Sequence, residues 1–228
     1  MIEFLFLDLD DTILDFHRAE RLAISKTFRE FGLEPTDAVL DRYHEINKLH
    51  WQRLERGEIT RDQVLVGRFR MLFEELGKNA DPEQIARSYE HNLGIGHYYL
   101  PGAREAVDAL QSHYRLFLAS NGTASVQHSR LTSAGLYPCF EQVFVSQDLG
   151  FNKPAKEFFD ACAARIPGYD AAKAMMVGDS LTSDILGGIR AGMRTCWINP
   201  AHKQAPEGIR PDYEIESLAL LPALLRGL

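Results

Sequence analysis

The chain has few cysteines and no motif that would pair them. Its three cysteines are odd in number and widely spaced, and none belongs to a CxxC pair: Cys139, Cys162 and Cys196. Disulfide frameworks and structural zinc sites need even-numbered or closely spaced cysteines. We therefore expect reduced, buried thiols and exclude the disulfide-rich and zinc-ribbon classes of protein.

The sequence also lacks a long apolar run and an excess of positive charge. No stretch approaches the roughly 20 apolar residues of a membrane-spanning helix. Glu3 and Asp8 interrupt the apolar N-terminal stretch, which argues against a signal peptide. The formal net charge is −7, whereas binding to a nucleic-acid polymer needs a basic surface. We expect a cytoplasmic protein with no membrane or nucleic-acid partner.

The remaining composition is that of an ordinary globular protein. Of the 228 residues, 45% are hydrophobic and 25% are charged, and we find no internal repeat or low-complexity tract. This length suits one large domain, or a core domain that carries a smaller insertion.

From residue 101 onward, short apolar runs alternate with stretches of helical periodicity. The runs are β-branched or aromatic and end at turn residues; they are 115–119, 142–146, 174–177 and 195–199. The helical stretches are 103–112, 124–134, 154–165 and 183–191. Together with the apolar run at 4–7, this alternation predicts an α/β fold: a Rossmann-like parallel sheet flanked by helices. Within 183–191, two adjacent glycines indicate close packing against the sheet.

The segment from about residue 16 to 93 shows no strand signal. It predicts about four helices, with Thr36 or Asp37 as one helix cap, a capping box at 60–63, and a capping Asp81 before Pro82. We therefore expect a core domain formed by 1–15 and 96–228, interrupted by a small all-helical domain at 16–95.

Four short motifs fall at, or shortly after, the ends of the predicted strands. They are Asp8-Leu-Asp10-Asp-Thr12, Ser120-Asn121-Gly122, Lys153-Pro154, and Gly178-Asp179-Ser180 with Asp184 in the following turn. Because parallel topology brings the carboxyl ends of strands to one edge of the sheet, we expect these side chains to meet there.

This ordered set resembles the haloacid dehalogenase superfamily of phosphotransferases. The resemblance covers nearly the whole chain, and the helical insertion stands where that superfamily carries a small helical cap. It implies that Asp8 is a nucleophile that forms an aspartyl-phosphate. It also implies that Asp10 is the acid for the leaving group and the base for water. Because dehalogenases of this superfamily lack that acid, Asp10 favours a phosphatase.

The resemblance implies roles for the other motifs as well. Ser120 would donate its hydroxyl to a phosphate oxygen, with the amides of Asn121 and Gly122 helping to bind the anion. Lys153 would neutralise charge on Asp8 and the phosphate. By itself, Ser120-Asn121-Gly122 is also a good turn sequence.

The resemblance further implies a Mg²⁺ cofactor. Asp8 and Asp179 would supply carboxylates and Asp10 its backbone carbonyl, since Mg²⁺ prefers oxygen ligands. Asp184 would orient the metal's ligands or waters rather than bind the ion directly. An alternative for Asp184 is that it caps the helix that begins there.

The substrate is less clearly indicated. Residues 47–51 and 54–60 of the helical segment, and 206–209 near the C-terminus, look like the pyrimidine 5′-nucleotidase branch, which acts on UMP, dUMP and dTMP. Trp51 would stack on a base and Asn47 would hydrogen-bond its edge; the alternative for Trp51 is packing inside the helical domain. The eight histidines form no recognisable ligand spacing.

The sequence thus predicts a Mg²⁺-dependent phosphomonoester hydrolase that acts on a small-molecule phosphate ester, most simply a nucleoside monophosphate. A sugar phosphatase or phosphomutase with the same core is one alternative. A non-catalytic binding module on this fold is another, although such a module needs no carboxylate at both Asp8 and Asp10. The sequence does not distinguish a monomer from a homodimer.

Overall fold

The computed structural model describes residues 1–228 and contains two compact units. Met1–Phe16 and His97–Leu228 form one, which we call the α/β unit, and His17–Gly96 forms the other, the helical unit. Each boundary lies one residue later than the sequence predicted.

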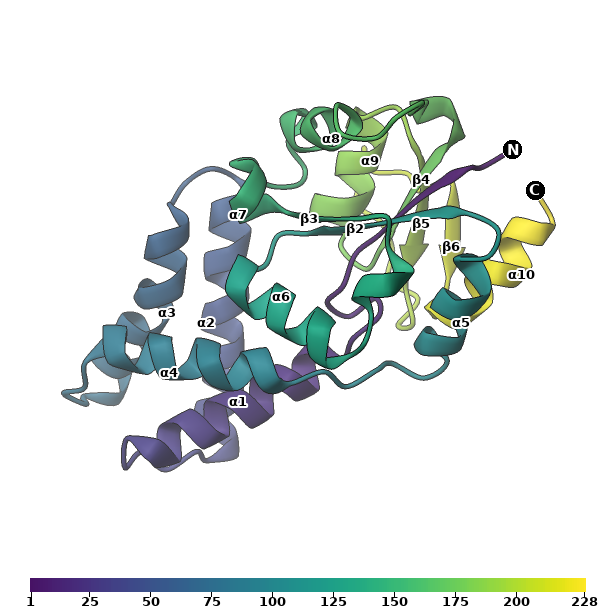
Figure 1. Ribbon diagram of the computed structural model, residues 1–228. Helices are drawn as coiled ribbons and strands as arrows, with labels where there is room; N and C mark the ends of the chain where they lie inside the picture. Colours follow the sequence, from purple (N-terminus) through teal and green to yellow (C-terminus); the bar gives the residue numbers. More distant parts are fainter. The chain divides into compact units, whose positions relative to one another are not determined.

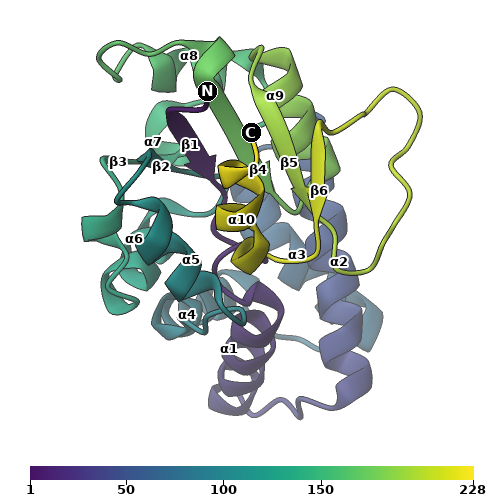
Figure 2. The same cartoon turned by 90° about the vertical axis from the view of Figure 1, so that its right-hand side faces the viewer.

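A six-stranded parallel sheet forms the centre of the α/β unit, in the order β3-β2-β1-β4-β5-β6 (Figure 1). The strands are β1 Phe4–Leu7, β2 Arg115–Ser120, β3 Gln142–Val145, β4 Ala174–Gly178, β5 Arg194–Ile198 and β6 Tyr213–Ile215. The predicted parallel sheet and its first five strands are confirmed. The sixth strand was not predicted, because three residues are too few to show a period. The loop that leads to β6 projects from the sheet edge in Figure 2.

Helices cover both faces of this sheet. They are α5 Ala103–Leu110, α6 Ala124–Ser133, α7 Ser146–Leu149, α8 Lys156–Ala163, α9 Leu186–Arg190 and α10 Leu221–Arg226. Figure 1 shows α8 and α9 on one side of the sheet and α5, α6 and α10 on the other. The short helices α7 and α10 were not predicted, and Ser146, expected at a strand end, instead begins α7.

Two hydrophobic clusters explain why β1 is apolar at every position. Leu5 and Leu7 pack in the cluster that contains residues of α5 and α10. Phe4 and Phe6 belong to the cluster on the other face, where Phe6 stacks on Phe117 with ring centroids 5.2 Å apart. Since the strand is buried on both faces, no position faces water and no polar alternation appears.

The close packing expected of the two adjacent glycines in α9 is confirmed against the sheet for Gly188, whereas Gly187 packs against α8. A Cβ on Gly187 would lie 2.6 Å from the ring of Phe159, and one on Gly188 would lie 2.9 Å from the Cβ of Met176. Both positions therefore admit only glycine without movement of the neighbouring side chains.

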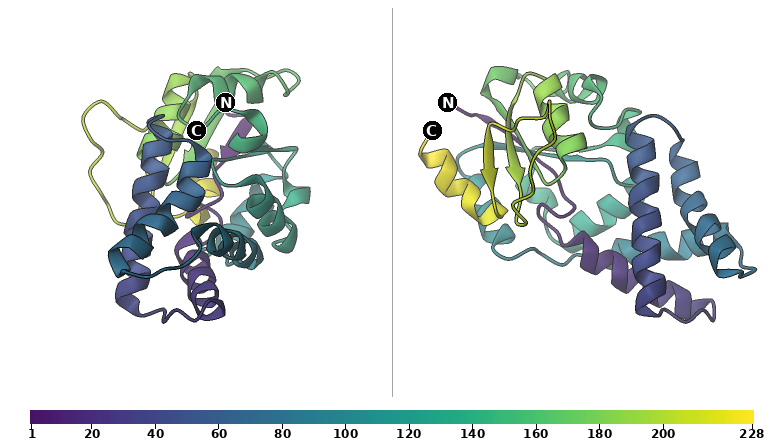
Figure 3. Two further views of the ribbon diagram at one scale, coloured as in Figure 1. Left: turned by 90° about the vertical axis from the view of Figure 1, so that its left-hand side faces the viewer. Right: turned by 180° about the vertical axis from the view of Figure 1, so that it is seen from behind.

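The helical unit contains four helices, as predicted: α1 Phe16–Glu30, α2 Asp37–Glu55, α3 Arg61–Leu76 and α4 Pro82–Ile95. Thr36 caps α2, Thr60 and Gln63 form the capping box of α3, and Asp81 caps α4. Helices α2 and α3 lie side by side (Figure 3). No helix of the chain is both long and apolar enough to cross a membrane.

Candidate active site

Polar side chains from three separate segments meet beyond the carboxyl ends of the central strands. Asp8 directly follows β1, Asp179 directly follows β4, and Asp184 lies in the next turn of the chain. Lys153 comes from the loop between α7 and α8. Carboxylate oxygens of the three aspartates lie within 4.8 Å of one another. The parallel order of the sheet produces this convergence.

Lys153 is the cation at the centre of this group. Its side chain is 1% exposed, and its Nζ donates hydrogen bonds to Asp8 Oδ1 at 2.7 Å, Asp184 Oδ1 at 2.6 Å and the carbonyl of Ala119 at 2.6 Å. The side chain of Asn121 holds the backbone of Lys153 from both sides, at 2.8 and 2.9 Å. A lysine is rarely buried without such partners, so the loop is built to present this ammonium group to two carboxylates.

The electrostatics of the site are dominated by burial of like charges. Burial raises the pKa of Asp8 to about 8; Lys153 opposes this rise, and Asp184 and Asp10 add to it. Burial and the neighbouring charges of Asp184 and Asp8 also hold the pKa of Asp179 well above its usual range. One ammonium group does not neutralise this many carboxylates, so the site favours binding of a further cation.

The donor set fits a hard divalent cation. Asp8 and Asp179 offer carboxylate oxygens at the open end of the sheet, and no nitrogen or sulfur ligand stands beside them. Oxygen-only sites of this kind suit Mg²⁺, which keeps several waters and takes one or two carboxylates. The residues that would hold the ion are therefore Asp8 and Asp179, with the backbone carbonyl of Asp10 as a further candidate.

Both carboxylate oxygens of Asp184 are held by hydrogen bonds, and its role as an orienting residue stays a prediction. One of its carboxylate oxygens accepts from Lys153, and the other accepts from the backbone N–H of Ser180 at 3.1 Å. The turn that carries it is capped by the Ser180 side chain, so Asp184 is not the helix cap. Gly178 makes the approach possible, because a Cβ there would collide with the Asp184 carboxylate.

The backbone of Asp179 is held by a residue that the sequence analysis did not single out. The indole Nε1 of Trp197, on β5, donates to the Asp179 carbonyl at 2.8 Å. A buried tryptophan usually satisfies its N–H, but nothing in the sequence indicates that Trp197, 18 positions from Asp179, does so here.

The carboxylate of Asp10 has two partners on α6, which the sequence analysis also missed. Gln127 Nε2 donates to Asp10 Oδ2 at 2.6 Å, and Arg130 forms an ion pair with Oδ1. Both partners are almost fully buried, whereas the Asp10 side chain is 28% exposed. One feature of the sequence could have indicated these partners: Gln127 and Arg130 are polar residues three positions apart in a predicted helix, a spacing that places both on one side.

Ser120 is linked to Asp10 through the same glutamine. Gln127 Nε2 lies 2.8 Å from Ser120 Oγ, which also accepts the backbone N–H of Gly122 at 3.1 Å. The hydroxyl of Ser120 is thus positioned beside Asp10 by a shared amide. Phosphate binding by Ser120, Asn121 and Gly122 stays a prediction.

Asn47 and Trp51 both lie on α2 in the helical unit. Asn47 is 2% exposed, and its amide donates to Glu20 and accepts from Arg68, so both ends are used within this unit. Trp51 is half-buried, and the guanidinium of Arg61 lies 5.4 Å from its ring centroid. Contact of these two side chains with a base stays a prediction.

Comparisons with known proteins identify the family of this chain. Residues 2–192 match the haloacid dehalogenase-like hydrolase family. The pyrimidine 5′-nucleotidase PynA of Streptococcus pneumoniae is 38% identical over 216 residues, which are 94% of this chain and 91% of that protein. The pyrimidine 5′-nucleotidase YjjG of Escherichia coli is 32% identical over 223 residues, 98% and 97% of the two chains.

A solved structure is similar over the same extent. The crystal structure of the HAD-hydrolase YfnB of Bacillus subtilis, bound to magnesium, has a TM-score of 0.94 and 40% identity, and the match covers 98% of each chain. The sheet and the helical insertion define a protein of the α/β class, and the family match identifies it as a hydrolase. This chain belongs to the haloacid dehalogenase-like hydrolases, and it is an enzyme.

Proposed function

We propose that this enzyme is a Mg²⁺-dependent phosphomonoesterase that works through an aspartyl-phosphate on Asp8. The observation that carries the proposal is the contact of Lys153 with both Asp8 and Asp184, together with a further carboxylate, Asp10, that Gln127 and Arg130 hold. A nucleophile, a buried cation and an acid–base group are the parts that phosphoryl transfer through a carboxylate requires.

The proposed reaction has two steps. In the first, a carboxylate oxygen of Asp8 bonds to phosphorus as the ester oxygen leaves, and Asp10 gives that oxygen its proton. In the second, Asp10 takes a proton from water, whose oxygen bonds to phosphorus and releases inorganic phosphate and the Asp8 carboxylate. Lys153 offsets the negative charge on Asp8 and the transferring group throughout. When bound, Mg²⁺ supplies charge neutralisation and orientation of the phosphate.

We infer that the substrates are nucleoside 5′-monophosphates with a pyrimidine base. The support is the similarity over nearly full length to the two proteins named pyrimidine 5′-nucleotidase. The partly exposed indole of Trp51, with its flat apolar surface, is the candidate to stack on a base.

A substrate panel tests this proposal. We expect phosphate release from UMP, dUMP and dTMP to exceed release from sugar phosphates, to stop with EDTA, and to return with Mg²⁺. Activity on sugar phosphates alone would keep the chemistry and remove the nucleotidase assignment. Release of a phosphoryl group onto a second sugar hydroxyl would indicate a mutase, and failure on every ester would support a binding module.

The Gln127→Leu variant tests how Asp10 is positioned. Because Gln127 holds both Asp10 and Ser120, we expect kcat/KM for UMP to fall by about ten- to a hundredfold, part of what a general acid contributes. The fall should be smaller for p-nitrophenyl phosphate, whose leaving group departs without a proton. Gln111→Leu, an exposed glutamine of the same unit, serves as the control. Equal losses for both esters would contradict a role through Asp10.

Binding of Mg²⁺ should depend on pH because a proton competes for Asp8. Burial raises the pKa of Asp8 from 3.8 to about 8, so the apparent affinity should increase by up to about tenfold per pH unit toward that value. The native metal-free protein then holds more protons than the unfolded chain, and its stability falls as the pH rises through this window. Calorimetric titration with Mg²⁺ in two buffers of different ionisation enthalpy should show that binding releases protons. A Mg²⁺ affinity independent of pH would contradict the raised pKa of Asp8.

A further inference from the structure

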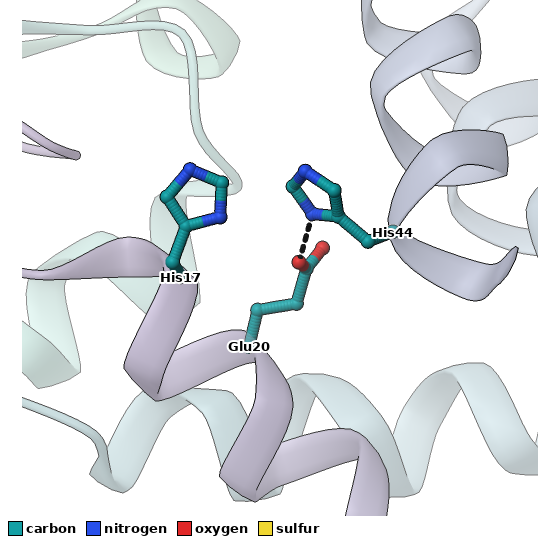
Figure 4. A group of neighbouring side chains, drawn as sticks. All are labelled: His17, Glu20 and His44. Atoms are coloured by element: carbon teal, nitrogen blue, oxygen red, sulfur yellow. Dashed lines mark hydrogen bonds and ion pairs between the residues drawn. The ribbon is translucent and has the colours of Figure 1, made fainter. Parts of the chain in front are cut away.

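A second group of potential metal ligands lies wholly within the helical unit. Figure 4 shows His17 and Glu20 on α1 facing His44 on α2. One ligand atom from each of the three side chains lies within 4.8 Å of the others. His44 Nδ1 is 2.6 Å from Glu20 Oε2, and the two imidazole ring centroids are 4.7 Å apart.

The local sequence explains why two of these three side chains lie together. His17 and Glu20 are three residues apart on one helix, so they share a face. His44 joins them from the neighbouring helix. All three ligand atoms therefore come from regular elements rather than loops, which favours a defined geometry.

The burial of the Glu20 carboxylate is a second observation that supports a bound cation. Glu20 is 3% exposed, and its ion pair is with His44, which is charged only when protonated. Its other oxygen accepts from the neutral amide of Asn47 at 2.6 Å, and Asn47 in turn accepts from Arg68. The amide fixes the orientation of the carboxylate without neutralising it. A buried carboxylate in this position favours a cation beside it.

We propose that His17, Glu20 and His44 bind a divalent first-row transition-metal ion, with Zn²⁺ as the representative. Two imidazoles and one carboxylate suit zinc and its neighbours, whereas Mg²⁺ prefers oxygen ligands alone. The hydrogen bond from Asn47 to Glu20 is the outer contact that orients a metal-binding carboxylate.

The ring positions allow the ion to enter and be coordinated. His17 is exposed and His44 is half-buried, so solvent reaches the open side of the group and can supply the fourth ligand. Tetrahedral coordination at ordinary zinc distances needs ligand atoms roughly 3.4 Å apart. An ion bound by all three side chains would therefore widen the 2.6 Å contact between His44 Nδ1 and Glu20 Oε2 and draw in the exposed His17 side chain. The bound ion would link the first turn of α1 to α2 and stabilise the helical unit.

The test uses the full-length protein with excess Mg²⁺, which occupies the oxygen-donor site at Asp8 before Zn²⁺ or Co²⁺ is added as a probe. We expect a single tight site by calorimetry, a tetrahedral Co²⁺ absorption spectrum, and X-ray absorption features of imidazole ligands. The oxygen-donor site at Asp8 produces no imidazole signal, so these readouts distinguish the two sites. They do not depend on phosphatase activity, so this proposal and the proposed function can fail separately.

Three variants decide the outcome. His17→Ala removes an exposed ligand and should weaken Zn²⁺ binding at least about tenfold while leaving the fold, checked by circular dichroism, unchanged. Glu20→Gln should do the same and keeps the side-chain shape. His91→Ala removes an exposed histidine of the same unit and should bind as the wild type does. Wild-type affinity in His17→Ala, or equal loss in His91→Ala, would overturn the proposal. Zn²⁺ should also raise the Tm of the wild type but not of His17→Ala.

Discussion

Replacement of Asp8 by asparagine is expected to reduce kcat for every phosphate ester by on the order of 10⁴-fold or more, as removal of a nucleophile does elsewhere. The asparagine amide has nearly the same shape as the carboxylate, but its nitrogen and oxygen are poor nucleophiles. Lys153 keeps its contacts with Asp184 and the Ala119 carbonyl in this variant, so the fold should persist. Phosphate release and thermal unfolding measure the two effects.

The matched control is Asp160→Asn, which changes an exposed aspartate of the same unit that pairs only with Lys156 at the surface. It should retain wild-type activity. Acid quenching during turnover gives a direct readout: the wild-type peptide that contains Asp8 should gain the mass of a phosphoryl group. Turnover by Asp8→Asn near the wild-type rate, or a phosphorylated peptide elsewhere, would contradict the nucleophile assignment.

Replacement of Lys153 by methionine should damage both catalysis and stability. Methionine fills a similar volume but leaves Asp8 and Asp184 facing each other without their shared cation. We expect kcat to fall by about 10²- to 10³-fold, as when a charge-stabilising donor is lost. The free energy of unfolding should fall by about 3–5 kcal/mol, because breaking a buried ion pair leaves uncompensated charge.

Lys156→Met provides the comparison, since Lys156 is exposed and lies in a surface pair with Asp160. Such pairs contribute about 1 kcal/mol or less. We expect Mg²⁺ to restore part of the Tm of Lys153→Met, since the ion offsets the same carboxylates, without restoring kcat. A Lys153→Met enzyme with wild-type kcat would remove Lys153 from the proposed mechanism.

Much of the architecture could be predicted because its signals are local. The strand at Phe4–Leu7 is apolar throughout because both faces are covered, and the caps Thr60 and Asp81 mark helix starts in the sequence itself. Strand β6 and helices α7 and α10, which are three to six residues long, were not predicted. Elements that short are stabilised by packing against the rest of the unit rather than by their own pattern.

The contacts within the site could be predicted only in part. That the motif residues would gather at one sheet edge could be anticipated from the parallel strand order. Their partners could not: Gln127 and Arg130 reach Asp10 from positions 117 and 120 residues away. No local period records which buried polar side chain meets which carboxylate, because that choice depends on how helix α6 packs on the sheet.

The α/β class, the helical insertion and the residue types of the proposed phosphoryl-transfer site could be predicted from the sequence, because periodicity, capping and strand-end motifs each involve only a few neighbouring residues. Three contacts became visible only in the folded chain: Lys153 bridges Asp8 and Asp184, Asn121 holds the Lys153 backbone, and His44 meets Glu20. These contacts depend on folding because burial sets the pKa values and pairings of charged groups, and burial arises only when distant segments pack together.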